Sequence, residues 1–105
     1  MKSTGTEIRR ELLAQVEACV CKDRQNTYGD AEDNFKVIAN YWNIWLRQRG
    51  VLQETSSICV NTTDVAMMCA LIKVARTSSS PNHIDNWVDL AGYAICGGGI
   101  ALKPK

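Results

Sequence analysis

The stretch NHIDNWVDLAGY, from Asn82 to Tyr93, decides how this chain folds because it puts two carboxylates into an otherwise apolar helical pattern. On an α-helix, Asp85, Asp89 and Tyr93 are spaced four residues apart and therefore share one face. Burying a charge without a partner is very costly. The acidic face is therefore a solvated stripe, a member of an ion-pair network, or an acidic site for a metal ion or a cationic partner.

Size and charge restrict the classes of protein to which the chain can belong. Its 105 residues predict a single domain over 1–105. The 12 Lys and Arg nearly balance the 11 Asp and Glu, so no global field favours DNA, RNA or an anionic membrane. No apolar run reaches the roughly 20 residues that a membrane span needs. Five cysteines behind a charged N-terminus predict reduced thiols in a cytoplasmic protein.

Apolar residues recur at helical spacing in four segments, which predicts an all-α fold. The expected architecture is a compact bundle of about four helices, with an irregular connection between the second and the third. The predicted helices cover residues 6–21, 31–49, 64–77 and 83–96.

The ends of these helices are predicted from capping residues. Asp30 is expected to cap the second helix, and Thr62 or Thr63 the third. Asn82, paired with Asp85, is expected to start the fourth helix, and the three glycines at 97–99 are expected to end it.

The side chains of the middle helices divide into predicted core and polar faces. For the second helix, the predicted core face is Phe35, Ile38, Ala39, Trp42, Trp45 and Leu46, and the polar stripe is Lys36, Asn40, Asn43 and Arg47. For the third helix, the predicted core face is Val65, Met68, Cys69 and Ile72. Three tryptophans and several apolar faces exceed what a small bundle readily hides, so we expect a homodimer or a larger homo-oligomer.

Charged side chains at three places are candidates for a ligand site. Metal sites in helical bundles are built from side chains on facing helices. Hard oxygen ligands suit Mg²⁺ or Mn²⁺, and lysine and arginine hold phosphate oxygens. The candidate metal ligands are Glu32, Asp33, Asp85 and Asp89, and the candidate phosphate contacts are Lys73 and Arg76, with Arg24 and Tyr28 from the preceding loop. The alternatives are that these charges pair with one another or are merely solvated.

Several short blocks in a fixed order resemble a small helical family of phages and prophages that is often labelled MazG-like. The blocks are Arg24, Tyr28-Gly29, Glu32-Asp33-Asn34-Phe35, Ile38-Ala39, Trp42, Asp64-Val65, Lys73, Arg76, Asp85-Asn86-Trp87 and Asp89-Leu90-Ala91-Gly92-Tyr93. They extend from about residue 20 to residue 97. The chain is also similar to a helical domain found beside phage nucleotide-modification genes.

The resemblance implies an all-α nucleoside triphosphate pyrophosphohydrolase that is usually oligomeric and uses magnesium. Carried over to this chain, it makes Glu32 and Asp89 catalytic, with Glu32, Asp33, Asp85 and Asp89 as metal ligands. It also implies a nucleotide partner, located in the host cytoplasm if the protein is phage-encoded. The implied substrate-binding residues are Arg24, Tyr28, Asn34, Lys73, Arg76, Asn86 and Tyr93.

The chain departs from the enzymes in its acidic motifs. Their ExxE and ExxD pairs correspond most closely to Asp30-x-x-Asp33 and Asn86-x-x-Asp89 here. An asparagine cannot supply the negative charge that a second metal ion needs. Two alternatives to hydrolysis therefore stay open: a non-catalytic nucleotide-binding protein, such as a phage sponge for a host signalling nucleotide, and a structural interaction module.

Overall fold

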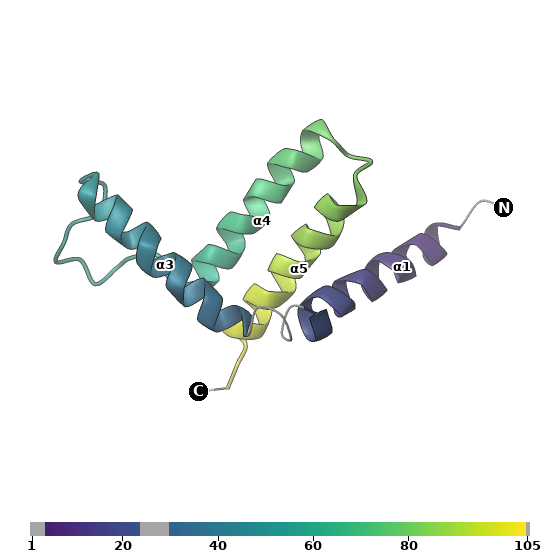
Figure 1. Cartoon of the computed structure of the whole chain (residues 1–105), viewed down its shortest axis with the longest axis horizontal. Coiled ribbons are helices and arrows are strands. Elements are labelled where there is room, and N and C mark those ends of the chain that lie inside the picture. Colours follow the sequence, from purple (N-terminus) through teal and green to yellow (C-terminus); the bar gives the residue numbers. More distant parts are fainter. Residues whose placement is uncertain (1–3, 24–29, 105) are drawn as a thin grey trace.

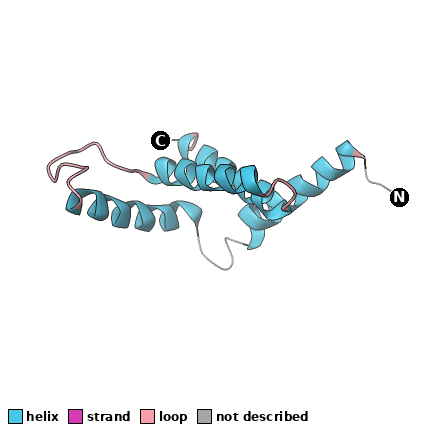
Figure 2. Cartoon of the chain, turned by 90° about the horizontal axis from the view of Figure 1, so that it is seen from above, coloured by secondary structure: helices cyan, strands magenta, loops and turns pink. Residues whose placement is uncertain are grey.

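Four α-helices and one short π-helical segment make up the computed structural model, which describes residues 4–23 and 30–104. The helices are α1 (Gly5–Glu17), α3 (Ala31–Gln48), α4 (Thr62–Ser79) and α5 (Ile84–Ala101), and the π-helical segment η1 (Ala18–Asp23) directly continues α1. Figure 2 shows only helices and loops in these parts of the chain. The prediction of an all-α fold with four packed helices is confirmed.

Helix α5 is the centre of the arrangement, because α1, η1, α3 and α4 all pack against it. Helices α4 and α5 form an antiparallel hairpin, and α3 and α1 lie on opposite sides of it (Figure 1). This central position agrees with the apolar pattern of the 82–93 stretch. It also means that a side chain on α5 can be reached from several helices.

The core lies where the first half of α3 meets the start of α4 and the second half of α5. Phe35 and Ala39 of α3 and Val65 and Ala66 of α4 are its buried members. Tyr93, Cys96 and Ile100 are among the partly buried residues packed against them. The aromatic ring of Phe35 lies 6.3 Å from that of Tyr93, measured between centroids.

The three glycines at 97–99 do not end the fourth helix, as the sequence suggested; α5 continues through them to Ala101. Each glycine weakens a helix by about 1 kcal/mol relative to alanine. Gly97 is buried, and a Cβ placed on it would lie 3.0 Å from the Cβ of Ala66. The close packing of α5 against α4 therefore requires a glycine here and holds the helix together despite its low propensity.

Neighbouring glycines of this run should respond oppositely to alanine. Gly98 has no atom within 4 Å of an added Cβ, so Gly98→Ala should stabilise the fold by about 1 kcal/mol through helix propensity. Gly97→Ala places its methyl group against Ala66, which is fully buried and cannot move aside, so this variant should be less stable than Gly98→Ala by about 1–2 kcal/mol. Urea unfolding followed by circular dichroism measures both; equal effects would show that α4 and α5 do not pack this closely.

The helix starts were predicted to within two residues, but their capping side chains differ in two cases. Asp30 caps α3 as expected, accepting from the backbone N–H of Glu32 at 3.3 Å. Helix α4 is capped by Asn61 rather than by a threonine, in a reciprocal capping box with Asp64. Helix α5 begins after His83, which makes no side-chain cap, so the predicted pairing of Asn82 with Asp85 is wrong.

Asn43 was predicted to lie on a polar stripe, but it is buried and fixes the connection between α3 and α4. Its Nδ2 donates to the Val60 carbonyl, and its Oδ1 accepts from the Val60 N–H, both at 2.8 Å. Arg47, one turn further along α3, donates to the Ser56 carbonyl at 3.3 Å. The side chains of Asn43 and Arg47 thus satisfy backbone groups of the irregular segment, which cannot pair them within a regular helix or sheet.

Part of the predicted core lies on the surface of the chain instead. Trp45 is 64% exposed, and Met68 and Ile72 are exposed as well. The helical period is correct, but α3 and α4 each carry apolar residues on more than one side. The periodicity alone therefore did not identify which side faces the core.

Removing the Asn43 amide should destabilise the chain through its connection to Val60. Asn43→Ala leaves a half-buried N–H and carbonyl without their partner, at a cost of about 2 kcal/mol. Asn40→Ala, at an exposed position of the same helix, is the matched control and should change stability by less than about 0.5 kcal/mol. Chemical denaturation compares the two, and equal stabilities would contradict a structural role for Asn43.

Candidate functional site

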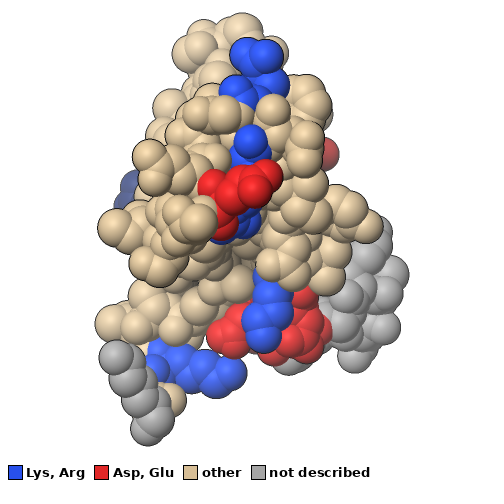
Figure 3. All heavy atoms as spheres, turned by 90° about the vertical axis from the view of Figure 1, so that its left-hand side faces the viewer, with Lys and Arg blue, Asp and Glu red and all other residues tan. Residues whose placement is uncertain are grey.

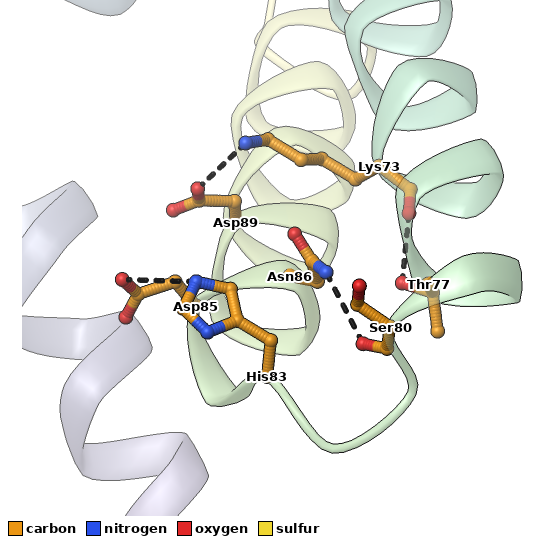
Figure 4. A network of polar contacts seen from close by, with 7 residues as sticks. All are labelled: Lys73, Thr77, Ser80, His83, Asp85, Asn86 and Asp89. Carbon is orange, nitrogen blue, oxygen red and sulfur yellow. Dashed lines mark hydrogen bonds and ion pairs between the residues drawn. The ribbon is translucent and has the colours of Figure 1, made fainter.

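A lysine and an aspartate face each other across the hairpin and form the centre of the candidate site. Lys73 extends from α4 to α5, where its Nζ lies 3.0 Å from Oδ2 of Asp89 (Figure 4). The Lys73 side chain is only 16% exposed, whereas that of Asp89 is 41% exposed. The ammonium group is thus held largely inside the protein, with its counter-charge at the solvent edge.

The register of the hairpin brings these two residues together. Ala66 meets Gly97 at a point where the two helices lie close together. Lys73 follows Ala66, and Asp89 precedes Gly97, by about two helical turns each. Helices α4 and α5 run antiparallel (Figure 1). The seam that begins at Ala66 and Gly97 therefore also brings Lys73 beside Asp89.

Two neighbouring residues on α5 make other contacts: Asp85 lies at the surface, and Asn86 binds the turn between α4 and α5. Asp85 is 70% exposed on its side chain, and its Oδ2 lies 3.7 Å from Nε2 of the exposed His83. Asn86 is buried, and its Nδ2 donates to the Ser80 carbonyl at 3.4 Å. Figure 4 shows these contacts beside the Lys73–Asp89 pair. Asn86, the expected substitute for a catalytic carboxylate, therefore ties α5 to the end of α4.

The acidic residues of α3 lie at a different place. Oε2 of the half-buried Glu32 is 3.4 Å from Nζ of Lys103, which follows the C-terminal end of α5, and Asp33 is exposed. Glu32 and Lys103 line a cavity of about 400 Å³ between η1, the start of α3 and the end of α5. Asp89 is about eleven residues from Ile100 in this lining, or roughly 16 Å along the helix axis.

The carboxylates predicted as metal ligands are thus distributed over two places in one chain. Within residues 4–23 and 30–104, no group of three or more His, Cys, Asp or Glu side chains is arranged to hold a metal ion. Glu32 pairs with Lys103 and Asp89 with Lys73. The four candidate carboxylates therefore do not converge on one place within the described residues.

The remaining predicted site residues take several positions. Arg76 is exposed one turn beyond Lys73 on α4, and Asn34 is half-buried near the start of α3. Tyr93 packs against the core beside Phe35. Arg24 and Tyr28 lie outside the described residues. Lys103 was placed in a C-terminal tail by the sequence, and its contact with Glu32 follows from the continuation of α5 past the glycines.

Comparison with known proteins places the chain in a family. Residues 11–101 match the domain of unknown function DUF6378. The chain belongs to the DUF6378 family. The gene 55 protein of Mycobacterium phage L5 is 36% identical over 83 residues, which are 79% of this chain and 47% of that protein. The gene 55 protein of Mycobacterium phage D29 is 33% identical over 85 residues, covering 81% of this chain and 50% of that protein.

This DUF6378 protein is a distant homologue of phage proteins, and it spans about half the length of the curated relatives it matches. No solved structure matches it significantly. The matched family carries no MazG designation, so the MazG-like resemblance rests on the residue blocks in the sequence. None of the helices in the described ranges has the combination of length and apolarity that crossing a bilayer requires.

Two aspartates on α5 should differ in what they contribute to the stability of this DUF6378 protein. Asp89→Asn removes the counter-charge of a largely buried lysine and should destabilise the fold by about 1–2 kcal/mol. Asp85→Asn, at an exposed position one turn earlier, should change stability by less than about 0.5 kcal/mol. A thermodynamic cycle that adds Lys73→Met to Asp89→Asn isolates the pair. A coupling of zero would mean that Lys73 and Asp89 do not interact in solution.

Proposed function

We propose that this protein binds a nucleotide through its phosphate groups and their Mg²⁺ ion, at a site on the α4–α5 hairpin. The hairpin site consists of Lys73, Arg76, Asp85, Asn86 and Asp89. The observation that carries the proposal is the pair formed by Lys73 and Asp89, because it holds a carboxylate at the solvent edge of the hairpin beside a largely buried cation.

A nucleotide that carries Mg²⁺ presents both signs of charge to its binding site. Phosphate oxygens are held by ammonium and guanidinium groups, and Mg²⁺ commonly takes one or two carboxylates together with those phosphates. Lys73 and the exposed Arg76 lie one turn apart on α4 and supply cations. Asp85 and Asp89 lie one turn apart on α5 and supply two carboxylates. The site therefore complements the ligand as a whole, and the metal ion arrives as part of the ligand.

The exposed fractions of the Lys73 and Asp89 side chains favour a site that a ligand can enter and leave. Asp89 is half-buried and reaches solvent, so a ligand can approach its free carboxylate oxygen while Lys73 stays in place. Lys73 is fixed by the packing of its stem, which lowers the conformational entropy lost when it binds a phosphate. An ion pair between two exposed side chains would lack this fixed lysine stem.

Binding is proposed ahead of hydrolysis because of where the other carboxylates lie. The reaction implied by the MazG-like resemblance converts a nucleoside triphosphate to a monophosphate and pyrophosphate, with Glu32 and Asp89 acting together. In a single chain Glu32 pairs with Lys103 at the other end of α5. Hydrolysis is therefore kept as the alternative outcome of the same experiment.

A panel of nucleotides tests the proposal directly. The protein is titrated with linear ribo- and deoxyribonucleoside triphosphates and with cyclic dinucleotides, each with and without Mg²⁺, in a calorimeter. We expect Mg²⁺-dependent binding of at least one class, and recovery of the ligand intact by chromatography. Pyrophosphate and monophosphate in the recovered ligand would support the enzyme instead. Absence of binding up to about 1 mM, a free energy of only about −4 kcal/mol, would overturn the proposal.

Substitutions locate the ligand on the hairpin. Lys73→Gln and Asp89→Asn should each weaken binding at least tenfold, which corresponds to about 1.4 kcal/mol. Lys36→Gln, at an exposed position of α3, removes the same charge away from the hairpin and should leave the affinity unchanged. If Lys36→Gln weakens binding as much as Lys73→Gln, the attraction is a general effect of charge and the site is wrongly placed.

A further inference from the structure

A cavity of about 400 Å³ lies between η1, the start of α3 and the end of α5, and the nucleotide proposal makes no use of it. We call it the end cavity. Its volume falls in the range of pockets that bind small molecules. Its apolar lining is formed by Val20, Ala31, Ile95, Gly99 and Ile100. An apolar wall with a few polar groups is the usual composition of a site for a small organic molecule.

One of the glycines of α5 keeps the end cavity open. Gly99 belongs to its wall, and a Cβ added to Gly99 would meet no atom within 4 Å. The close contact with Ala66 that requires a glycine at position 97 is therefore absent at Gly99, although a glycine weakens any helix that contains it. A larger side chain at Gly99 would take up part of the open space, so the glycine leaves room for a ligand.

The charged groups of the end cavity favour a cation. Among the described residues of its lining, Asp30 and Glu32 supply two carboxylates and Lys103 supplies one ammonium group. Oε2 of Glu32 lies 3.4 Å from Nζ of Lys103, farther than the roughly 2.8 Å of a strong hydrogen bond between charged groups. The side chain of Glu32 is 29% exposed, whereas that of Lys103 is 62% exposed. A ligand ammonium can therefore take the place of Lys103 beside Glu32.

The two helix ends at the cavity agree with this preference. The C-terminal end of α5 carries a partial negative charge, and the last turn of this helix contains no basic side chain. The partial positive charge at the start of α3 is offset by Asp30, which caps the helix, and by Glu32 and Asp33 in its first turn. Figure 3 shows acidic side chains gathered at the level where α3 begins and α5 ends in Figure 1. The surroundings of the cavity thus favour positive over negative charge.

From these observations we infer that the end cavity binds a small organic cation, with its apolar body against the apolar wall and its ammonium group beside Glu32. The cavity supplies the space, and Glu32 supplies the charge that selects the ligand. The inference is independent of the nucleotide proposal, because the end cavity contains none of the hairpin-site residues.

Three naphthalene compounds of similar shape and different charge test the inference. The compound 1-naphthylmethylammonium is a cation, 1-naphthylmethanol is neutral and 1-naphthylacetate is an anion. Each is titrated into the full chain near neutral pH, and binding is measured by calorimetry. We expect the ammonium to bind about tenfold more tightly than the alcohol, because it gains a charged contact with Glu32, and the carboxylate to bind most weakly.

Substitutions of charged residues identify the group that selects the cation. Glu32→Gln should abolish the preference for the ammonium over the alcohol. Asp33→Asn removes the same charge from an exposed position in the same helical turn and should keep the preference. Lys103→Gln should increase the affinity for the ammonium, because Glu32 then loses its competing partner. A decrease in that affinity would contradict the proposed exchange of Lys103 for the ligand.

Two measurements locate the ligand in the cavity. Gly99→Leu fills the space and should weaken the binding of all three compounds, whereas Gly98→Leu, outside the cavity lining, should not. Circular dichroism establishes that the helices of both variants persist. Cys21 lines the cavity, so saturating ammonium should slow its alkylation by iodoacetamide several-fold, while the exposed Cys59 keeps its rate. This protection needs no variant and decides the matter if Gly99→Leu fails to fold.

Several outcomes would overturn the inference. Absence of ammonium binding up to about 1 mM would remove the site. Equally tight binding of the carboxylate would contradict the preference for a cation. Ammonium binding that survives in Glu32→Gln but is lost in Asp89→Asn would place the cation on the hairpin. None of these results bears on nucleotide binding, which is measured with a different ligand and different variants.

Discussion

The close contact between α4 and α5 is the constraint on which the rest of the structure depends. Ala66 and Gly97 allow the two helices to approach until a single additional methyl group would collide. This contact fixes the antiparallel register, and the register in turn sets Lys73 opposite Asp89 two turns away. The same contact allows α5 to continue through the glycines at 97–99, which would end a less tightly packed helix. Helices α3 and α1 pack against this hairpin, whose geometry is defined by the contact between α4 and α5.

The charges of the chain follow the same geometry. Asp89 pairs with Lys73 on the hairpin, and Glu32 pairs with Lys103, which follows the end of α5. Because the 12 Lys and Arg nearly balance the 11 Asp and Glu, a phosphorylated ligand must be met by a local group of cations. A site made of one lysine and one or two aspartates suits a ligand that brings its own metal ion.

Much of the fold could be predicted from the sequence because helical periodicity reports secondary structure directly. The four helices, the Asp30 cap and the irregular segment after α3 all follow from local patterns. What could not be predicted depends on contacts between distant residues. The three glycines were mistaken for a helix end because their low propensity is visible in the sequence, whereas Ala66 on the facing helix is not. Asn43 was assigned to solvent for the same reason, since its partner Val60 belongs to a segment without periodicity.

In the candidate site, too, local spacing could be predicted from the sequence, whereas contacts between distant residues could not. The spacing of Asp85 and Asp89 correctly places both on one side of α5, and Lys73 was identified as a candidate partner. The expected convergence with Glu32 was inferred from helices meeting in a compact bundle. The described chain is extended instead, and the carboxylates of α3 lie near the far end of α5. Apolar side chains on both sides of α3 and α4 made the core face ambiguous in the sequence.

The most direct test of the account is a two-dimensional amide NMR spectrum of the protein titrated with the Mg²⁺-nucleotide that binds it most tightly. The account predicts that the largest shifts fall on the backbone around Lys73 and Arg76 and around Asp85 to Asp89. Shifts confined to the cavity between Glu32 and Lys103, or a spectrum that no nucleotide changes, would contradict it.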